Sequence, residues 1–316
     1  MILSIIETQN NEIKKSAFEL ATFAQNLAKI LNSESVGLVF GNIDKTELEE
    51  VGKFGFSKIY QINTNSLDPQ NLAQAVSDVA LKINATEILL SKSSNTDSYA
   101  GRLAAKLGAN LATNIVELPT IDGGLKVKSN IYTGKAYENL TLNGKIKILV
   151  IKKNAIEALD LGLKSTIENF EFENKISKIK VVETIKTSGD LLLTEAEIVV
   201  SGGLGMKGPE NWHLIEGLAK VLHAATGCSK PVSDKDWRPH HEHVGQTGIK
   251  VSPNIYIAVG ISGAIQHLAG VNSSKVIVVI NKDPEAPFFK AADYGIVGDA
   301  FDILPKLTAA AKNYVS

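Results

Sequence analysis

The chain has 316 residues, of which 44% are hydrophobic and 21% are charged; 33 Lys and Arg against 34 Asp and Glu leave a net charge near −1. This length permits two domains, each with its own core. The balanced charge gives no electrostatic footprint for nucleic acid or an anionic membrane surface. No apolar run approaches the roughly 20 residues that cross a bilayer, so we do not expect a membrane-embedded protein.

The start of the chain and its cysteine content bear on the compartment. Residues 1–7 lack a basic segment and a cleavage site, so we interpret them as a first strand and not as a signal or transit peptide. The single cysteine, Cys228, leaves no internal disulfide and fits a reducing environment. Both features favour a cytoplasmic protein of bacterial type.

Short apolar runs alternate with segments of helical period in the first part of the chain. Strands are predicted at 2–6, 36–40, 59–62 and 87–90, and helices at 13–31, 69–83 and 98–107. Thr96 or Asp97 is expected to cap the last of these helices, and Gly108 to end it. Such alternation is typical of a parallel sheet.

The pattern changes after residue 110. Short strands with glycine-containing turns between 111 and 151 predict a β-rich edge or a hairpin extension. A charged, glycine-poor stretch over 166–188 is expected to link two domains, 1–188 and 189–316, with the boundary near Ser188. We expect an α/β fold in which each domain is a mainly parallel, three-layer sheet. The first domain shows no chemical constellation.

A glycine motif follows the strand predicted at 196–200. Gly203, Gly205 and Gly208 have the G-x-G-x-x-G spacing, ahead of a helix predicted at 210–225. In such a turn the peptide N–H groups can approach a pyrophosphate. The dinucleotide fingerprint also requires an acidic residue about 20 residues on, and 220–232 contains none. The standard NAD-binding fold is therefore disfavoured, and a tight turn without a ligand remains the alternative.

Three polar turns lie at strand ends in the second half of the chain. They span 244–248, ahead of a strand at 255–259; 260–267, directly after that strand; and 281–287, after a strand at 276–280. Strand ends of a parallel sheet line one crevice where ligands collect. The three turns therefore predict one extended ligand, most simply a nucleotide cofactor.

Two further segments invite opposing interpretations. Gly227 is placed to end the helix at 210–225, and Ser229 and Lys230 follow it. Lys230 could bring positive charge to an electron-rich ring. The alternative is an ordinary solvated loop lysine. The cluster at 240–243, His-His-Glu-His, suggests a metal site. Adjacent ligands rarely converge on one ion, so a polar loop is favoured there.

Single polar residues complete the pattern. Ser262 is expected to cap a helix that begins near Gly263, which places His267 about one turn in, where a donor suits an anionic oxygen. The alternative is a structural histidine. Asn281 and Asp299 follow predicted strands at 276–280 and 294–297 and suit phosphate, ribose or adenine contacts, although both residue types are common in turns for local reasons.

The run from 244 to 299 resembles the C-terminal domain of the electron transfer flavoprotein α subunit. It contains Val-Gly-Gln-Thr-Gly at 244–248 and Ile-Ala-Val-Gly-Ile-Ser-Gly-Ala-Ile-Gln-His-Leu-Ala-Gly at 257–270. It also contains Ile-Asn-Lys-Asp-Pro-Glu-Ala-Pro at 280–287 and Ala-Asp-Tyr-Gly at 292–295. The N-terminal half is similar to this family in layout only.

The resemblance implies an electron carrier rather than a substrate-transforming enzyme. FAD would be held by the C-terminal domain, and a β subunit carrying AMP would complete a heterodimer. Electrons would arrive from flavin dehydrogenases, such as the acyl-CoA dehydrogenases of fatty acid β-oxidation, and leave toward a membrane quinone oxidoreductase. Alternatives are a subunit of an NADH-oxidising or electron-bifurcating flavoprotein, and a nucleotide-binding regulatory module without redox activity.

The resemblance also implies roles for individual residues. Thr247 would lie beside the flavin N5, His267 would stabilise the anionic semiquinone, and Ser229 would donate to the cofactor. Asn281 and Asp299 would hold the adenylate end. The expected cofactor-binding residues are Gly203, Leu204, Gly205, Ser229, Lys230, Val244, Gly245, Gln246, Thr247, Ser262, Gly263, Ala264, Ile265, Gln266, His267, Asn281, Asp299 and Ala300.

Two residues depart from the family pattern. Lys230 stands where the family usually has arginine, and Leu204 where many members have arginine. Lysine keeps the charge but lacks the planar guanidinium that stacks on a ring. We therefore expect a less stable semiquinone than is usual in the family.

Overall fold

A computed structural model describes residues 1–9, 11–64, 68–134, 136–173, 182, 192–194 and 196–315. The chain divides into two compact units, Met1–Thr184 and Ile185–Ser316. The predicted boundary near Ser188 lies outside the described residues. Both units are α/β, as the sequence predicts. In the described part of the chain, no helix is long and apolar enough to cross a membrane.

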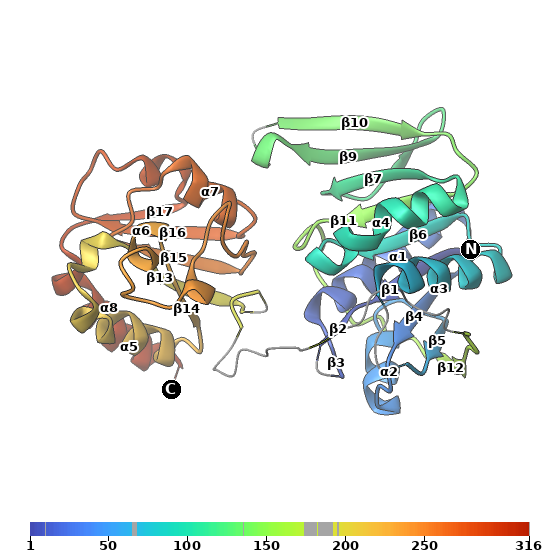
Figure 1. Cartoon of the computed structure of the whole chain (residues 1–316), viewed down its shortest axis with the longest axis horizontal. Coiled ribbons are helices and arrows are strands. Elements are labelled where there is room, and N and C mark those ends of the chain that lie inside the picture. Colours follow the sequence, from blue (N-terminus) through green and yellow to red (C-terminus); the bar gives the residue numbers. More distant parts are fainter. Residues whose placement is uncertain are drawn as a thin grey trace. The chain divides into compact units, whose positions relative to one another are not determined.

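The first unit is built on one large, mainly parallel sheet. Its strand order in the described residues is β10-β9-β7-β11-β6-β1-β4-β5-β12, with β8 beside β9 (Figure 1). Pairing is parallel from β7 through β12, whereas β9 pairs antiparallel with β10, β8 and β7. The strands are β1 (Ile2–Ile6), β4 (Ser35–Phe40), β5 (Lys58–Ile62), β6 (Glu87–Ser91), β7 (Asn110–Ile115), β8 (Thr120–Ile121), β9 (Leu125–Ile131), β10 (Ala136–Leu142), β11 (Lys147–Ile151) and β12 (Thr166–Asn169), with a small ribbon of β2 (Thr8–Gln9) and β3 (Glu12–Ile13).

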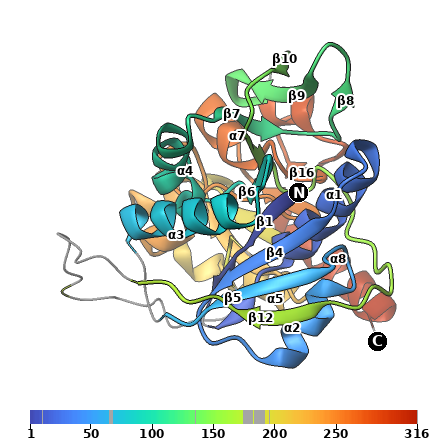
Figure 2. The same cartoon turned by 90° about the vertical axis from the view of Figure 1, so that its right-hand side faces the viewer.

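Helices cover both faces of this sheet. Figure 2 shows α1 (Lys15–Leu31) and α2 (Lys45–Gly52) on one side of the strands and α3 (Pro69–Lys82) and α4 (Ser94–Leu107) on the other. Successive side chains of β1 point alternately to the two faces of the sheet. Ile2 and Ile6 pack in the core beneath α1 and α2, and Leu3 and Ile5 pack in the core beneath α3 and α4. A short 3₁₀ turn, η1 (Tyr132–Gly134), joins β9 to β10. The three predicted layers are confirmed.

Two local predictions in this unit were wrong. The cap of α4 is Ser93, whose hydroxyl accepts the Thr96 N–H at 3.0 Å, so the helix begins earlier than Thr96 or Asp97 would allow. Its end at Gly108, with φ of 58°, is confirmed. The start of the expected linker is instead the edge strand β12, paired in parallel with β5. Its charged side chains are typical of an edge strand, and Glu168 pairs with Lys58 at 2.7 Å.

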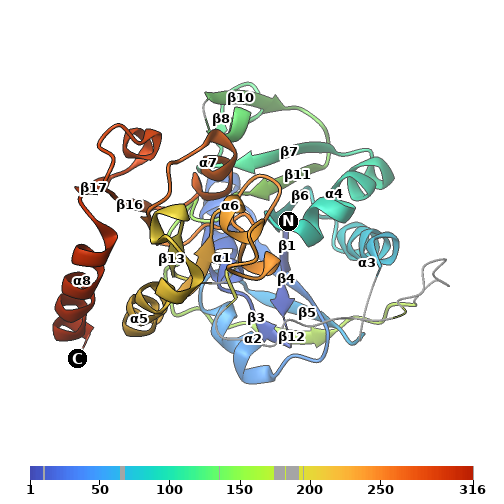
Figure 3. The ribbon, with the colours of Figure 1, turned by 60° about the vertical axis from the view of Figure 1, so that its left-hand side comes forward.

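The second unit has a five-stranded parallel sheet in the described residues, with the order β14-β13-β15-β16-β17. Helices α5 and α8 cover one face and α7 covers the other (Figure 3). The short 3₁₀ helix η5 packs on the same face as α7. The strands are β13 (Ile198–Gly202), β14 (Ala225–Cys228), β15 (Ile255–Val259), β16 (Val276–Asn281) and β17 (Tyr294–Val297). The helices and turns are η2 (Leu204–Met206), η3 (Pro209–Asn211), α5 (His213–Val221), α6 (Lys230–Ser233), η4 (His240–Glu242), α7 (Ile265–Val271), η5 (Pro287–Ala291) and α8 (Ala300–Val315).

The helix predicted at 210–225 is shorter than expected. Helix α5 ends at Val221, and His223 has φ of 50°, a left-handed conformation that turns the chain into β14. Gly227 therefore does not end a helix; it lies inside β14. A Cβ there would lie 3.1 Å from Val244 Cγ2 and 3.3 Å from Ser201 Oγ. This glycine lets the 244–248 turn approach the sheet closely.

Candidate functional site

The expected cofactor residues follow the carboxyl ends of the five parallel strands of the second unit. Gly203–Gly205 follows β13, Ser229 follows β14, and the 260–266 segment follows β15. Asn281 ends β16, and Asp299 comes after β17. After β13 the chain forms β14 on one side of it and then β15 on its other side. This reversal makes β13 and β15 the switch point of the sheet, and ligands bind at the switch point in sheets of this kind.

The glycine motif closes the base of this crevice. The Gly203 N–H donates to the Val259 carbonyl at 2.8 Å, and the Gly205 N–H donates to the Gly260 carbonyl at 3.0 Å. A Cβ on Gly205 would lie only 2.6 Å from Gly260 Cα. The glycines allow two backbones to touch, and their N–H groups are used within the protein. Leu204, 43% exposed, is the large side chain that this turn presents to solvent.

Free donors lie instead in the segment after β15. In residues 196–315, no group accepts a hydrogen bond from the five consecutive peptide N–H groups of residues 262–266. Gly263 shapes this segment: its φ is 84°, and a Cβ there would lie 2.6 Å from Phe288 Cα. A run of unpaired peptide donors is a concentrated source of positive potential suited to an anion.

The predicted helix start was wrong here. Helix α7 begins at Ile265, with Ala264 as its N-cap residue and no side-chain cap. The Ser262 carbonyl accepts the Phe288 N–H at 3.0 Å, which ties the backbone at Ser262 to η5. Ser262 is therefore not a cap, and its side chain is exposed.

The turn at 244–248 packs along α7. The Gln246 N–H donates to the Gln266 carbonyl at 2.8 Å, and a Cβ on Gly270 would lie 2.6 Å from Gly245 Cα. Gln246 and Thr247 are exposed, whereas Val244 and Gly245 are buried. The structure thus places this turn against the helix that follows the donor segment. Both segments expose polar groups, as the sequence predicts.

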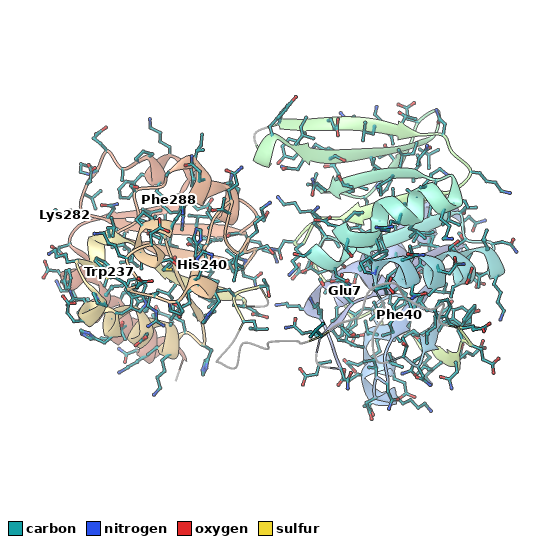
Figure 4. All side chains as sticks on the ribbon, in the orientation of Figure 1. Glu7, Phe40, Trp237, His240, Lys282 and Phe288 are labelled. Atoms are coloured by element: carbon teal, nitrogen blue, oxygen red, sulfur yellow. The ribbon has the colours of Figure 1, made fainter. Side chains whose placement is uncertain are left out.

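His267 is buried, with 6% of its surface exposed. Its Nε2 lies 2.9 Å from the Tyr256 hydroxyl, and Phe288, labelled in Figure 4, packs edge-on to its ring with centroids 5.7 Å apart. Burial, with the nearby His243, lowers the pKa of His267 to about 4, so the ring is neutral near pH 7. Sequence reasoning missed Tyr256. Its phenol, the one polar side chain in the apolar run 255–259, was the available signal.

Ser229 and Lys230 begin the short helix α6. Ser229 is 6% exposed, and its N–H donates to the Gly202 carbonyl at 3.0 Å. Lys230 Nζ lies 3.2 Å from Asp234 in an exposed pair. Such a pair contributes little, roughly 0.3–0.5 kcal/mol, so it does not prevent the ammonium from moving to another anion.

Asn281 and Asp299 have local structural roles. The Asn281 amide donates to the Ile261 carbonyl at 3.0 Å. The Asp299 carboxylate accepts the Phe301 N–H at 3.0 Å, which caps α8, and lies 3.6 Å from Lys207 Nζ. The Phe301 N–H, with a smaller contribution from Lys207, lowers the pKa of Asp299. Ala300, the first residue of α8, is buried. The two polar side chains hold the strand-end turns in place.

The histidine cluster at 240–243 is a tightly packed loop. Glu242 is buried and pairs with Arg238, whose Nε lies 2.9 Å from its carboxylate. His243 is 2% exposed, and burial, the largest cause, lowers its pKa. No group of three potential metal ligands occurs in the described residues. In the described residues, 240–243 forms a packed loop around the Arg238–Glu242 pair.

The corresponding edge of the first unit carries a buried acid. Glu7 follows β1, accepts hydrogen bonds from the hydroxyls of Ser93 and Thr96, and has Lys14 Nζ 4.0 Å away. Figure 4 labels Glu7 and Phe40 at this edge. The carboxylate thus anchors the capped start of α4 to the sheet, and the sequence pattern gave no indication of this network.

Comparison with known proteins identifies the family. The family described as "Electron transfer flavoprotein domain" matches residues 2–183, and "Electron transfer flavoprotein FAD-binding domain" matches residues 192–272. The α subunit of Bacillus subtilis is 33% identical over 315 residues, covering 97% of this chain and 96% of its own; that of Pseudomonas aeruginosa is 35% identical over 312 residues, covering 97% and 99%. A probable mitochondrial α subunit of Caenorhabditis elegans is 34% identical, covering 97% and 93%.

The chain belongs to the electron transfer flavoprotein α-subunit family. The family implies a flavin cofactor, and the second unit fits one in the chemistry of its exposed edge. Peptide donors at 262–266 suit phosphate oxygens, and Gln246 and Thr247 offer polar contacts. Leu204 and Ile265, 43% and 59% exposed, offer apolar surface to a ring. Lys230 is the only charged residue among the expected cofactor residues besides Asp299.

Proposed function

We propose that this protein is the α subunit of a heterodimeric electron transfer flavoprotein and holds FAD at the carboxyl edge of its second sheet. A β subunit carrying AMP would complete the complex. Electrons would come from flavin dehydrogenases, including acyl-CoA dehydrogenases, and pass to a membrane quinone oxidoreductase. Membership of the family supports this assignment, and the five unpaired peptide donors at 262–266 are the observation that carries the cofactor assignment.

Each exposed segment has a distinct task in this proposal. Bound FAD would supply one- and two-electron chemistry. Residues 262–266 would bind its phosphates, Gln246 and Thr247 would contact the ring, and Lys230 would add positive charge nearby. Asn281 and Asp299 would hold the turns that surround the adenylate end. Gly203 and Gly205 would shape the base of the site, since their N–H groups are already bonded.

The test removes a single donor from the 262–266 segment. Ile265 is the first residue of α7, a position where proline is well tolerated, and the preceding Ala264 has φ of −55° and ψ of 147°, which suits a residue before proline. Ile265→Pro therefore deletes one N–H with little change in fold. Ile265→Ala is the matched control, because it shortens the side chain but keeps the N–H.

The measurement is FAD retention by the full chain copurified with a β-type partner. Wild type should show flavin absorption bands after desalting. A lost hydrogen bond to a charged phosphate costs about 1.5 kcal/mol or more, so Ile265→Pro should weaken FAD binding about tenfold or more, and Ile265→Ala much less. A colourless wild-type complex that binds only AMP or ATP would reject the proposal in favour of a regulatory module. NADH oxidation by the complex would favour a dehydrogenase or bifurcating subunit.

A further inference from the structure

Tyr256 stands in an unusual position for a phenol. It lies in the middle of β15, is fully buried, and points its hydroxyl at His267 Nε2, 2.9 Å away. Its ring packs 6.5 Å from that of Phe288, so apolar surface surrounds the pair. A buried hydroxyl that needed no specific partner would be better replaced by phenylalanine. The hydroxyl therefore has a task that depends on the histidine.

The contact between Tyr256 and His267 restricts where the protons of the two groups can lie. Burial raises the pKa of Tyr256 above its usual value, so the phenol keeps its proton, and that proton needs an acceptor. The Nε2 of neutral His267 is the acceptor within hydrogen-bond distance. If Nε2 carried the imidazole proton, the phenol oxygen would accept it, and Tyr256 would have to turn its own proton toward Ser201, whose side chain also acts on this hydroxyl. Donation by Tyr256 to His267 instead leaves Nε2 bare and places the imidazole proton on Nδ1.

The remaining ring nitrogen of His267, Nδ1, has almost no exposed surface and makes no hydrogen bond of full geometry in the described structure. The Val244 carbonyl nevertheless acts on this ring as a hydrogen-bond acceptor, which raises the pKa of His267 against the larger lowering by burial. An acceptor beside the ring agrees with an N–H on Nδ1 and connects His267 to the start of the 244–248 turn. The first turn of α7, which carries His267, also supports the 244–248 turn through the Gln266 carbonyl. The orientation of this ring is therefore linked to the turn that presents Gln246 and Thr247.

We propose that Tyr256 is a positioning residue of the cofactor site. It holds His267 in one orientation, neutral, with its proton on Nδ1, and so fixes the polar environment that the first turn of α7 offers to the cofactor. This inference rests on the proposed function for its consequence, but not for the proton placement. His243 is the other titratable group that acts on His267, and its own lowered pKa keeps it neutral near pH 7.

Nitrogen NMR of histidine-labelled full chain, copurified with its partner, tests the proton placement. In wild type, the His267 signals should show a protonated Nδ1 and an unprotonated Nε2, with no change between pH 8 and pH 6. In Tyr256→Phe, the proton should redistribute toward Nε2. Tyr99→Phe, which alters another fully buried tyrosine in the first unit, is the matched control and should leave His267 unchanged. A wild-type Nε2 that carries the proton overturns the proposal, whether or not any variant folds.

FAD release tests the consequence. Loss of a net contribution near 1 kcal/mol corresponds to about fivefold faster FAD release in Tyr256→Phe. A double-mutant cycle with His267→Gln should be non-additive, because Tyr256 acts through the histidine. Additive effects, or no effect of Tyr256→Phe on the pH dependence of the flavin reduction potential, would overturn the positioning role. Absence of FAD from every variant and from wild type would reject the proposed function and leave the NMR result standing.

Discussion

His267 should make a large, separable contribution to the loss of stability of the second unit on acidification. Its pKa is about 4 in the folded protein, against an ordinary value of 6.5, because burial and the neighbouring His243 disfavour the charged ring. Between these values the unfolded chain binds more protons than the folded chain. Stability therefore rises with pH across this window and is lost as pH falls from about 6.5 toward 4. The perturbation is His267→Gln, which removes the titrating group and keeps a polar side chain.

The magnitude follows from the difference of about 2.5 pH units between the two pKa values. At about 1.4 kcal/mol per unit, full protonation would remove roughly 3 kcal/mol of the free energy of unfolding. Down to pH 5 the same linkage gives a loss of about 2 kcal/mol relative to pH 7.5. His267 is buried, so solvent screening does not reduce this figure as it would at the surface.

The assay is urea unfolding followed by tryptophan fluorescence. Both tryptophans of the chain, Trp212 and Trp237, lie in the second unit, so the signal reports that unit alone. Wild type should lose about 2 kcal/mol more than His267→Gln between pH 7.5 and pH 5. Carboxylates and His243 titrate in both proteins and cancel in the comparison. Equal losses in the two proteins would show that the histidine is not neutral and buried as described.

Further substitutions probe the same edge and its surroundings. Gly263→Ala should destabilise the second unit by roughly 2–4 kcal/mol in the fluorescence assay, because its φ is 84° and a Cβ would lie 2.6 Å from Phe288 Cα. Gly101→Ala, in open space within α4, should instead stabilise the first unit by about 0.5–1 kcal/mol in circular dichroism melts. Asp299→Ala should lower the urea midpoint of the second unit, because it removes the carboxylate that accepts the Phe301 N–H at the start of α8. Lys230→Arg should raise the yield of one-electron-reduced flavin in a reductive titration, and an unchanged yield would show that the planar guanidinium brings no advantage there.

The sequence predicted the architecture well where hydrophobic period and length agree. Strand β1 and helix α3 match their predicted ranges to within one residue, because the two faces of a covered parallel strand and the apolar stripe of a helix are both readable locally. The sequence-based predictions of secondary structure fail where a contact with a distant part of the chain determines the local structure. A strand at 166–169 forms because β5 offers a free edge, which a charged local sequence does not reveal. The end of α5 depends on a left-handed His223, a conformation that glycine or asparagine usually signals.

For the candidate site, the sequence predicted where the polar turns lie, and the binding roles of the individual residues stay predictions. The sequence placed polar turns at strand ends correctly, since parallel strands bring their carboxyl ends to one edge. It could not show that the N–H groups of Gly203 and Gly205 are bonded to the segment after β15, because that requires the register of two strands distant in the sequence. It also gave no indication that the Asn281 amide donates to the Ile261 carbonyl, and the expected ligand contact of Asn281 stays a prediction. Tyr256 was missed because an apolar strand conceals a buried phenol.

The hydrogen bonds of Gly203, Gly205 and Asn281 separate two kinds of polar group at the carboxyl edge of the second sheet. Some groups are bonded within the protein and support the backbone, and others remain unpaired. Gly203, Gly205 and Asn281 all bond to the segment between Val259 and Ile261, on three different atoms. Hydrogen bonds from both neighbouring strands therefore fix the position of residues 259–261. Because this backbone is fixed, the next residues can keep the five N–H groups of 262–266 away from protein acceptors. A phosphate-binding edge needs such rigid support, since donors that could reach protein acceptors would not stay free. If residues 262–266 bind a phosphate as we propose, the first two glycines of the G-x-G-x-x-G motif support that binding from the neighbouring loop.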